Sequence, residues 1–470
     1  MRMLVAGEWV AAGCEIPVHN PFDNSIVDSV PRARAADVER ALAFAARGAA
    51  TMRRMPGYER YLRLKKAAEI MEARADELAR TITLEEGKIL AEARFEVSRA
   101  VATMTDSAEE AKRLSGEVVP LDGAPGTGNR FGFTIRVPCG VVAAISPFNF
   151  PLNLVVHKVG PALAAGNSVI IKPATDTPLS ALKLAKILLE AGIPAEGVQC
   201  VTGSGGEIGD LICADPRVRK ITFTGSRDIG ERICKTAGLK KVTMELGSNS
   251  PVIILPDADL QKAAQAIAST GYANAGQVCI SAQRIIPLQS VYGDLIDALK
   301  PKVEAIGTGN PLDEQTKMGP MIRESDARRV EAWIQEAVGA GARLVTGGGR
   351  NGAMHAPTIV ADVHPDARLS RDEVFGPAVA VTPASSIDEA IALANDSRYG
   401  LSAAVFTSSL DAAMRFAREL ESGNIHINWG PQWRADLMPY GGLKESGFGK
   451  EGPRYAVQEM TELKMVVMHL

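Results

Sequence analysis

The sequence is poor in cysteine. Its 470 residues include only six, and no two of them form a C-x-x-C pair. This usage predicts a reduced compartment with free thiols, one of which can serve chemistry, so we expect a cytoplasmic protein. The six are Cys14, Cys139, Cys200, Cys213, Cys234 and Cys279.

A strong excess of charge and long apolar runs are also missing. The 52 basic residues against 55 acidic ones give a net charge of −3, which argues against nucleic acid as the partner. No uncharged apolar run reaches the roughly 18 residues of a membrane helix, and the start reaches Glu8 before a signal-peptide core could form. Since 46% of the residues are hydrophobic and 23% charged, a disordered chain is excluded.

Motifs for metals and nucleotide phosphates are sparse. There is no P-loop, no H-E-x-x-H and no G-x-S-x-G, and the six histidines form no metal-binding pair at helical spacing, so we expect no metal. A clean G-x-G-x-x-G after a strand is absent as well. The nearest glycine clusters are residues 203–209 and 223–230. The second follows an apolar run and opens a helical segment, where a phosphate could meet free backbone amides.

The chain does contain regular alternation of strand and helix patterns. Residues 37–49 and 59–80 show apolar positions at helical spacing. From residue 138, short apolar runs alternate with helical segments such as 178–190, for which Thr177 is a candidate N-cap and Gly192 follows the end. This alternation predicts an α/β protein with a doubly wound, mainly parallel sheet. The strands are expected at 140–145, 168–171, 198–201, 221–223 and 242–244.

A second alternating stretch runs from residue 251 to about 430, so a domain boundary is expected near Gly247. Two segments fit neither half. Residues 117–137 predict a hairpin with a Gly-rich turn. Residues 461–470 predict an isolated strand, whose unpaired backbone groups must find a partner elsewhere, such as on another subunit.

Three polar residues at predicted strand ends and turns are candidates for chemistry. Cys279 lies between apolar neighbours, where a cysteine is most often a small buried hydrophobe. Glu245 is an acid embedded in an apolar strand end, which is rare without a partner or a task. Asn149 lies in a turn bounded by prolines directly after a strand. Together they supply a nucleophile, a base and a hydrogen-bond donor.

Seven segments, in order along the chain, resemble the signature set of the aldehyde dehydrogenase superfamily. They are Ser-Pro-Phe-Asn-Phe-Pro at 146–151, Ile-Lys-Pro at 171–173, Phe-Thr-Gly-Ser at 223–226, Met-Glu-Leu-Gly at 244–247, Gly-Gln-Val-Cys at 276–279, Glu-Val-Phe-Gly-Pro at 373–377 and Pro-Tyr-Gly-Gly-Leu-Lys-Glu-Ser-Gly at 439–447. The resemblance implies two doubly wound parallel-sheet domains and a small β oligomerisation element. It implies a nucleotide-binding domain at 1–116 and 138–247, a catalytic domain at 248–450, and an oligomerisation hairpin and tail strand at 117–137 and 451–470.

The resemblance also implies roles for the three polar residues. Cys279 matches the nucleophile, whose thiolate attacks the aldehyde carbon. Asn149, with the backbone N–H of Cys279, matches the donor that holds the developing oxyanion, which is typically worth roughly 3 kcal/mol. Glu245 matches the base that activates water to hydrolyse the thioester.

The implied cofactor is NAD or NADP, without a metal. Lys172 and Glu373 match residues that hold the two riboses, and Phe375 matches one that packs near the nicotinamide ribose. Thr175 stands at the position that often carries glutamate, and its neutral hydroxyl cannot repel the 2′-phosphate of NADP by charge. Asp176 would disfavour NADP if its carboxylate faces the ribose. NAD is slightly favoured, with dual use left open. The cofactor-binding residues expected are Ile145, Ser146, Pro147, Phe148, Lys172, Thr175, Gly205, Gly209, Phe223, Gly225, Ser226, Ile229, Leu246, Glu373 and Phe375.

The substrate site is expected to contain Arg99, Phe150, His157 and Arg434. A guanidinium suits a phosphate, sulfonate or carboxylate because its fork donates two parallel bonds, although each arginine could instead be a solvated surface residue. The family usually has a second glycine where Ser248 stands, and this serine could tighten the turn or offer its hydroxyl.

The sequence therefore predicts NAD(P)-dependent oxidation of a short, anionic or hydroxylated aldehyde to its carboxylate. A coenzyme A-acylating enzyme is an alternative, which the retained Glu245 disfavours, and a non-catalytic binding protein is another. The expected partners are a small aldehyde and copies of the same chain, as a homodimer or homotetramer in which the tail strand and the 117–137 hairpin pair across a subunit boundary. Neither nucleic acid nor membrane is expected as a partner.

Overall fold

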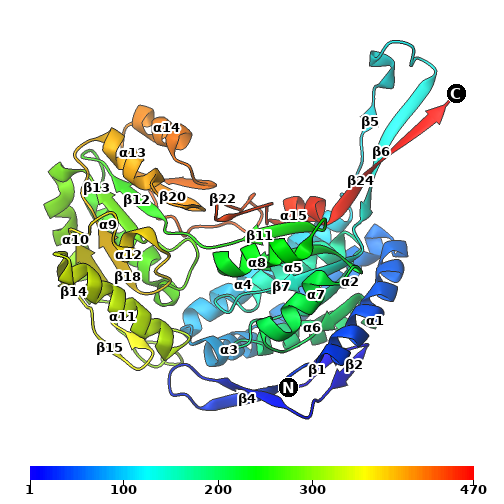
Figure 1. Ribbon diagram of the computed structural model, residues 1–470, viewed down its shortest axis with the longest axis horizontal. Helices are drawn as coiled ribbons and strands as arrows, with labels where there is room; N and C mark the ends of the chain where they lie inside the picture. Colours follow the sequence, from blue (N-terminus) through cyan, green and yellow to red (C-terminus); the bar gives the residue numbers. More distant parts are fainter.

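The computed structural model describes all residues 1–470 and contains two large sheets, each covered by helices (Figure 1). The first sheet has the strand order β2-β1-β9-β8-β7-β10-β11-β23. Its five central strands run parallel, and the outer pairs are antiparallel. The strands are β1 Met3–Val5, β2 Glu8–Val10, β7 Val141–Ile145, β8 Ser168–Lys172, β9 Val198–Cys200, β10 Val218–Thr224, β11 Lys241–Glu245 and β23 Gly447–Phe448.

Alternate residues of the central strands face two separate helix layers, as the twofold period of a strand requires. Val142 and Ala144 of β7 pack in the core beneath α2–α6, whereas Val141 and Ala143 pack in the core beneath α1, α7 and α8. The helices are α1 Ala35–Arg54, α2 Gly57–Ala73, α3 Ala75–Glu86, α4 Leu90–Ala111, α5 Asn153–Ala164, α6 Leu179–Glu190, α7 Asp210–Ala214 and α8 Arg227–Ala237. All five residues of β7 and of β8 are buried, which explains their continuous apolar character.

The second sheet has the order β14-β17-β18-β13-β12-β20-β21 and is parallel except for β14. Its strands are β12 Pro251–Ile254, β13 Arg284–Pro287, β14 Arg343–Thr346, β17 Thr358–Ala361, β18 Ala378–Val381, β20 Ser402–Phe406 and β21 Asn424–Ile427. The helices after β12 are α9 Leu260–Tyr272, α10 Tyr292–Glu304, α11 Glu324–Gly339, α12 Arg368–Arg371, α13 Ile387–Asn395, α14 Leu410–Glu419 and α15 Pro453–Glu459. The fold is that of two doubly wound sheets, as predicted, and the strands expected before residue 247 are all present.

Small sheets complete the structure. They are made by β3 Glu15–His19 with β4 Ile26–Pro31, β15 Arg350–Asn351 with β16 Met354–His355, β19 Tyr399–Gly400 with β22 Leu443–Lys444, and β5 Val118–Val119 with β6 Arg130–Pro138 and β24 Thr461–His469. The last of these sheets projects from the body of the molecule, with the C-terminus near its tip (Figure 1). None of the helices combines the length and the apolar character that crossing a membrane requires.

The hairpin predicted at 117–137 is present as β5 and β6, but the tail strand does not need another subunit. β24 pairs antiparallel with β6 of the same chain along its whole length, from Thr461 opposite Pro138 to His469 opposite Arg130. The predicted pairing of these two segments across a subunit boundary is therefore wrong. Helix α15 packs against α4 and α5, and the Met460 carbonyl accepts hydrogen bonds from Asn167 and Cys139, so the tail starts beside β6.

Two details of the helices also differ from the sequence prediction. The periodic stretch 59–80 is divided at Arg74 between α2 and α3. Thr177 does not cap α6, because Pro178 holds the N-cap position and the first free N–H groups, of Leu179 and Ser180, donate to the buried Glu85 at 2.7 and 2.9 Å. A carboxylate about 90 residues away in the chain thus takes the place of a local cap, which no local sequence pattern reveals.

The edge of the first sheet next to Glu245 depends on one glycine. Gly447 of β23 pairs with Glu245 of β11 and has φ +116°, and a Cβ on it would overlap the Met244 carbonyl oxygen. We expect Gly447→Ala to lower the free energy of unfolding by about 1–3 kcal/mol, measured by urea titration. Gly293→Ala is the matched control, because Gly293 lies in α10 with open space around it and should tolerate a methyl group. Equal stability of both variants would contradict this view of the edge.

Candidate active site

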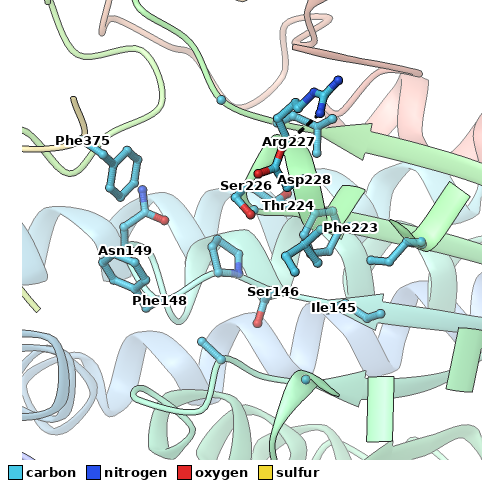
Figure 2. A pocket seen from close by; sticks show the side chains of 18 of the residues that line it. Ile145, Ser146, Phe148, Asn149, Phe223, Thr224, Ser226, Arg227, Asp228 and Phe375 are labelled. Carbon is cyan, nitrogen blue, oxygen red and sulfur yellow. Dashed lines mark hydrogen bonds and ion pairs between the residues drawn. The ribbon is translucent and has the colours of Figure 1, made fainter. Parts of the chain in front are cut away.

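A cavity of about 710 Å³ opens at the carboxyl ends of the first sheet's strands, where ligands of doubly wound proteins bind. Its wall contains all fifteen residues that the sequence predicted for cofactor binding, and also Asn149 and Cys279. In Figure 2, Phe148, Asn149 and Phe375 lie together on one side, and Ser226 lies with Arg227 and Asp228 at the start of α8. The cavity therefore connects a helix N-terminus to the predicted nucleophile.

Two buried ionisable residues in the cavity wall, Lys172 and Glu373, each make one hydrogen bond within the protein. Lys172 ends β8 and donates to the Pro173 carbonyl at 2.9 Å, and burial lowers its pKa to about 8. Glu373 accepts from the Ser248 N–H at 3.0 Å, and burial raises its pKa to about 7. The Ser248 hydroxyl lies 3.1 Å from that of Ser250, so this serine uses its backbone to hold Glu373 and its hydroxyl to hold the turn.

The cavity also has residues that sequence reasoning did not assign to it. Arg323 pairs with Asp176, with Arg323 Nε 3.1 Å from an Asp176 oxygen, so the carboxylate beside Thr175 is compensated. The Thr175 hydroxyl donates to the Gly203 carbonyl at 3.3 Å. Arg323 precedes α11, on the far side of the cavity, and no local motif links it to residue 176. Further lining residues of this kind are Arg329, Trp333, Asp372 and Tyr399.

The loop that carries Cys279 has an unusual backbone. Asn274, Ala275 and Gly276 all have positive φ, at 49°, 53° and 69°, which is costly for the two residues with side chains. Cys279 is partly exposed at the cavity wall, and its Sγ lies 3.1 Å from the Tyr440 hydroxyl. Desolvation by the surrounding protein raises the pKa of its thiol to about 12.

Asn149 connects this loop to the first sheet. Its Nδ2 donates to the Gln277 carbonyl at 2.8 Å, and its buried Oδ1 has no partner. The structure therefore brings Asn149 and Cys279 to the same part of the cavity, although 130 positions separate them in the chain.

Glu245, at the end of β11, lies behind the cavity wall. It is buried, and neither carboxylate oxygen has a hydrogen-bond partner. Burial, and then the neighbouring Glu451, raise its pKa well above the usual range. A raised pKa of this kind is typical of carboxyl groups that act as general bases.

None of the four residues predicted to contact substrate lines the cavity, and three of them, Arg99, His157 and Arg434, form part of a charged cluster. Arg99 binds Asp436 through two nitrogens at 2.7 and 3.0 Å, and His157 Nε2 lies 2.8 Å from the same carboxylate. Arg434 lies 3.2 Å from Glu451. The fourth residue, Phe150, has its ring centroid 3.9 Å from Lys88 Nζ.

The arginines are not solvated surface residues. The side chain of Arg434 is 5% exposed and that of Arg99 is 19% exposed, so the surface alternative is wrong. Sequence reasoning missed Asp436, which has no motif around it. Burial and the charge of Arg434 lower the pKa of His157 to about 4, so this histidine is neutral at physiological pH.

A second buried cluster lies between α3 and α4 and holds the loop of Asn149. Lys88 donates to Glu96 and to the Asn149 carbonyl, both at 2.6 Å. Glu96 accepts the N–H groups of Leu152 and Asn153, at the start of α5, at 3.0 and 3.1 Å. The turn that carries Asn149 is therefore bound at both ends by this ion pair.

The same cluster holds the loop of Cys279. The Asn274 N–H donates to Glu92 at 3.1 Å, and Asn274 Nδ2 donates to Glu86 at 2.8 Å and to the Asn149 carbonyl at 3.3 Å. Hydrogen bonds to carboxylates such as these can offset the strain of the positive φ angles nearby. One connection between two helices thus fixes the relative position of both loops.

Comparisons with known proteins find similar sequences and structures over nearly the whole chain. A family model described as "Aldehyde dehydrogenase family" matches residues 9–466. The chain is 49% identical over 468 residues to 3-sulfolactaldehyde dehydrogenase of Priestia megaterium, covering 100% of this chain and 98% of that protein. It is 37% identical over 471 residues to lactaldehyde dehydrogenase of Methanococcus vannielii, covering 99% and 100%. Glyceraldehyde-3-phosphate dehydrogenase GapN from Methanocaldococcus jannaschii, solved with NADP, superposes with a TM-score of 0.94 at 36% identity, covering 97% and 100%.

The bracing role of Lys88 can be tested by stability. Lys88→Met keeps most of the length of the side chain but leaves Glu96 without its buried cation, so we expect a loss of about 3–5 kcal/mol in the free energy of unfolding, measured by urea titration. Lys66→Met is the control, because its pair with Glu69 at 3.4 Å is exposed and should contribute less than about 1 kcal/mol. A Lys88 variant as stable as the Lys66 variant would show that the cluster does not brace the loops.

Proposed function

Because the chain belongs to the aldehyde dehydrogenase family, we propose that it oxidises a short hydroxylated aldehyde with an anionic end, of the sulfolactaldehyde type, to its carboxylate. That it is an aldehyde-oxidising oxidoreductase with a nicotinamide cofactor follows from the family. The observation that carries the proposal is that Cys279 and Asn149 line the same cavity as Ser226 and Arg227 at the N-terminus of α8.

The cavity residues fit a nicotinamide dinucleotide. Lys172 Nζ and the Glu373 carboxylate have unused hydrogen-bonding capacity for ribose hydroxyls, and the buried Ser146 Oγ, also in the wall, has no partner in the protein. Ser226 and the first N–H groups of α8 would hold the pyrophosphate. A nicotinamide held by these residues would supply the hydride acceptor for the oxidation.

The protein's own groups account for the other steps. The Cys279 thiolate attacks the aldehyde carbon, and the Asn149 amide with the Cys279 N–H binds the resulting oxyanion. Loss of the hydride leaves a thioester on Cys279. Glu245 takes a proton from water, which attacks the thioester and releases the carboxylate product. Coenzyme A is not needed as an acyl acceptor when this base is present.

Both NAD and NADP remain cofactors in the proposal. Thr175 carries no charge that would repel a 2′-phosphate, and the charge of Asp176 is compensated by Arg323. Neither residue excludes the smaller NAD, which keeps the slight preference suggested by the sequence.

An anionic substrate suits the charged cluster behind the nucleophile. Three cations, Arg99, Arg434 and Lys158, face two carboxylates, Asp436 and Glu451, while His157 is neutral. Arg434 Nε is buried without a partner. A sulfonate, phosphate or carboxylate at the end of a short aldehyde would compensate the remaining positive charge.

We also propose that residues 1–116 and 138–247 form the nucleotide-binding domain, 248–450 the catalytic domain, and 117–137 with 451–470 a self-association element that makes a homodimer or homotetramer. The projecting sheet of β5, β6 and β24 supports this element, since it exposes several large apolar side chains. They include Phe131, Ile135, Leu463, Met465 and Val467.

The proposal as a whole is tested by Cys279→Ala. We expect turnover to fall below about 1% of wild type, because the variant cannot form the covalent intermediate, while cofactor binding persists. The assay follows reduced nicotinamide with sulfolactaldehyde and with a neutral aliphatic aldehyde, each with and without coenzyme A. Turnover above that level would remove Cys279 as the nucleophile, and a strict need for coenzyme A would indicate the acylating reaction.

Glu245→Gln should separate the two half-reactions. The amide cannot accept a proton from water, so we expect a rapid burst of reduced cofactor followed by a slow steady state in stopped-flow absorbance. In wild type, deacylation should accelerate as the pH rises through the elevated pKa of Glu245, because only the ionised carboxylate is a base. In the Glu245→Gln variant, the rate of deacylation should not rise with pH in this way. A burst slowed as much as the steady state would place Glu245 in the first half-reaction.

Arg434→Leu should lower kcat/KM for the anionic aldehyde by about 10- to 100-fold more than for a small neutral aldehyde, whose smaller loss reflects the packing of Arg434 on Tyr440. Arg99→Leu should act in the same direction, because it frees Asp436 to repel the anion. Arg94→Leu is the matched control for Arg99, because Arg94 lies on the exposed side of α4, the helix that also carries Arg99. Equal losses for anionic and neutral aldehydes would mean that the arginines hold the site together and do not recognise charge.

A further inference from the structure

Tyr440 has a hydroxyl group whose only hydrogen-bond partner is the predicted nucleophile. The residue is 3% exposed, and its hydroxyl oxygen lies 3.1 Å from Cys279 Sγ. Its backbone is fixed by two hydrogen bonds with Glu451, at 3.2 and 2.8 Å. The mechanism above gives this hydroxyl no task, although it touches the reacting atom.

The ring of Tyr440 is held so that the hydroxyl stays near the sulfur. The guanidinium carbon of Arg434 lies 3.8 Å from the ring centroid, and Arg434 is itself held by Glu451. Cation–π packing of this kind restricts the ring and places positive charge over its face. The phenol is therefore positioned from both its backbone and its ring.

The direction of the hydrogen bond follows from the charge of the sulfur. A thiol can donate or accept, but a thiolate only accepts, so in the reactive state the proton on this bond belongs to Tyr440. Burial raises the pKa of Tyr440 well above its usual value, so the hydroxyl keeps its proton at physiological pH. No histidine serves as a cationic partner for the sulfur, since the nearby His157 is neutral and bound to Asp436.

We propose that Tyr440 is a catalytic residue whose O–H donates a hydrogen bond to the Cys279 thiolate and holds it ready to attack. The thiol proton passes to water in the cavity, the phenol keeps its own proton, and the hydrogen bond is released as sulfur bonds to the aldehyde carbon. Because desolvation disfavours the thiolate at this site, a single donor has a large effect on how much of it forms. The inference rests on the proposed function of Cys279 as nucleophile.

The test measures the thiolate without substrate. Iodoacetamide alkylation of Cys279 is followed against pH by the mass of its peptide, in the full-length protein without aldehyde or cofactor. Tyr440→Phe keeps the ring against Arg434 and removes only the donor. We expect alkylation to be about 10- to 100-fold slower at each pH near neutrality, where the thiolate is the minor form, and to reach the wild-type rate only at a pH about 1–2 units higher. Tyr272→Phe is the matched control, since that buried hydroxyl donates to the Thr358 carbonyl at 2.9 Å, and its alkylation should be unchanged.

An alkylation profile of Tyr440→Phe equal to wild type, or shifted to lower pH, would overturn the proposal, because the hydroxyl would then be neutral to the thiolate or would favour the thiol. If that variant fails to fold, 3-fluorotyrosine at position 440 keeps the packing and makes the phenol a stronger donor. Alkylation must then become faster, and an unchanged or slower rate would overturn the proposal. The proposed function fails separately, if alkylated Cys279 leaves aldehyde oxidation intact.

Discussion

The position of the reacting groups depends on the buried ion pair between Lys88 and Glu96. The loops of Asn149 and Cys279 are 130 positions apart in the chain and belong to different sheets, and neither is held by strand pairing. Lys88 binds the Asn149 carbonyl, and Asn274, held by Glu86 and Glu92, binds the same oxygen. One carbonyl oxygen thus joins both loops to the connection between α3 and α4. Charged side chains are costly to bury, so this arrangement is consistent with a requirement for fixed geometry at the site.

The pKa values of the acids and the thiol in the site depend on how few hydrogen-bond partners each group has. Glu245 has no hydrogen-bond partner, Cys279 has only a phenol, and Glu373 has a single backbone N–H, so burial dominates and raises all three pKa values. Asp436 shows the opposite case. Although burial opposes it, hydrogen bonds from His157 and Arg99 lower its pKa. Groups that exchange protons are left without partners, and groups that hold charge are paired.

Much of this could be read from the sequence where the signal is local. Strand and helix periods predicted both sheets, and the segments around Asn149, Glu245 and Cys279 predicted residues that the structure places near one another. Partners that are distant in the chain left no local signal. Glu85, and not Thr177, binds the first N–H groups of α6, and β24 pairs with β6 after α15. Asp436 forms an ion pair with Arg99, and the Tyr440 hydroxyl lies within hydrogen-bond distance of Cys279. Each depends on tertiary contacts that periodicity does not encode.

In the proposed reaction, Cys279 carries the acyl group between the two half-reactions. Mass spectrometry of the acid-quenched Glu245→Gln protein, after mixing with the anionic aldehyde and cofactor, tests it most directly. We expect an adduct on the Cys279 peptide with the mass of the aldehyde less two hydrogens, since oxidation precedes hydrolysis. No adduct, an adduct on another cysteine, or an adduct that retains both hydrogens would contradict it.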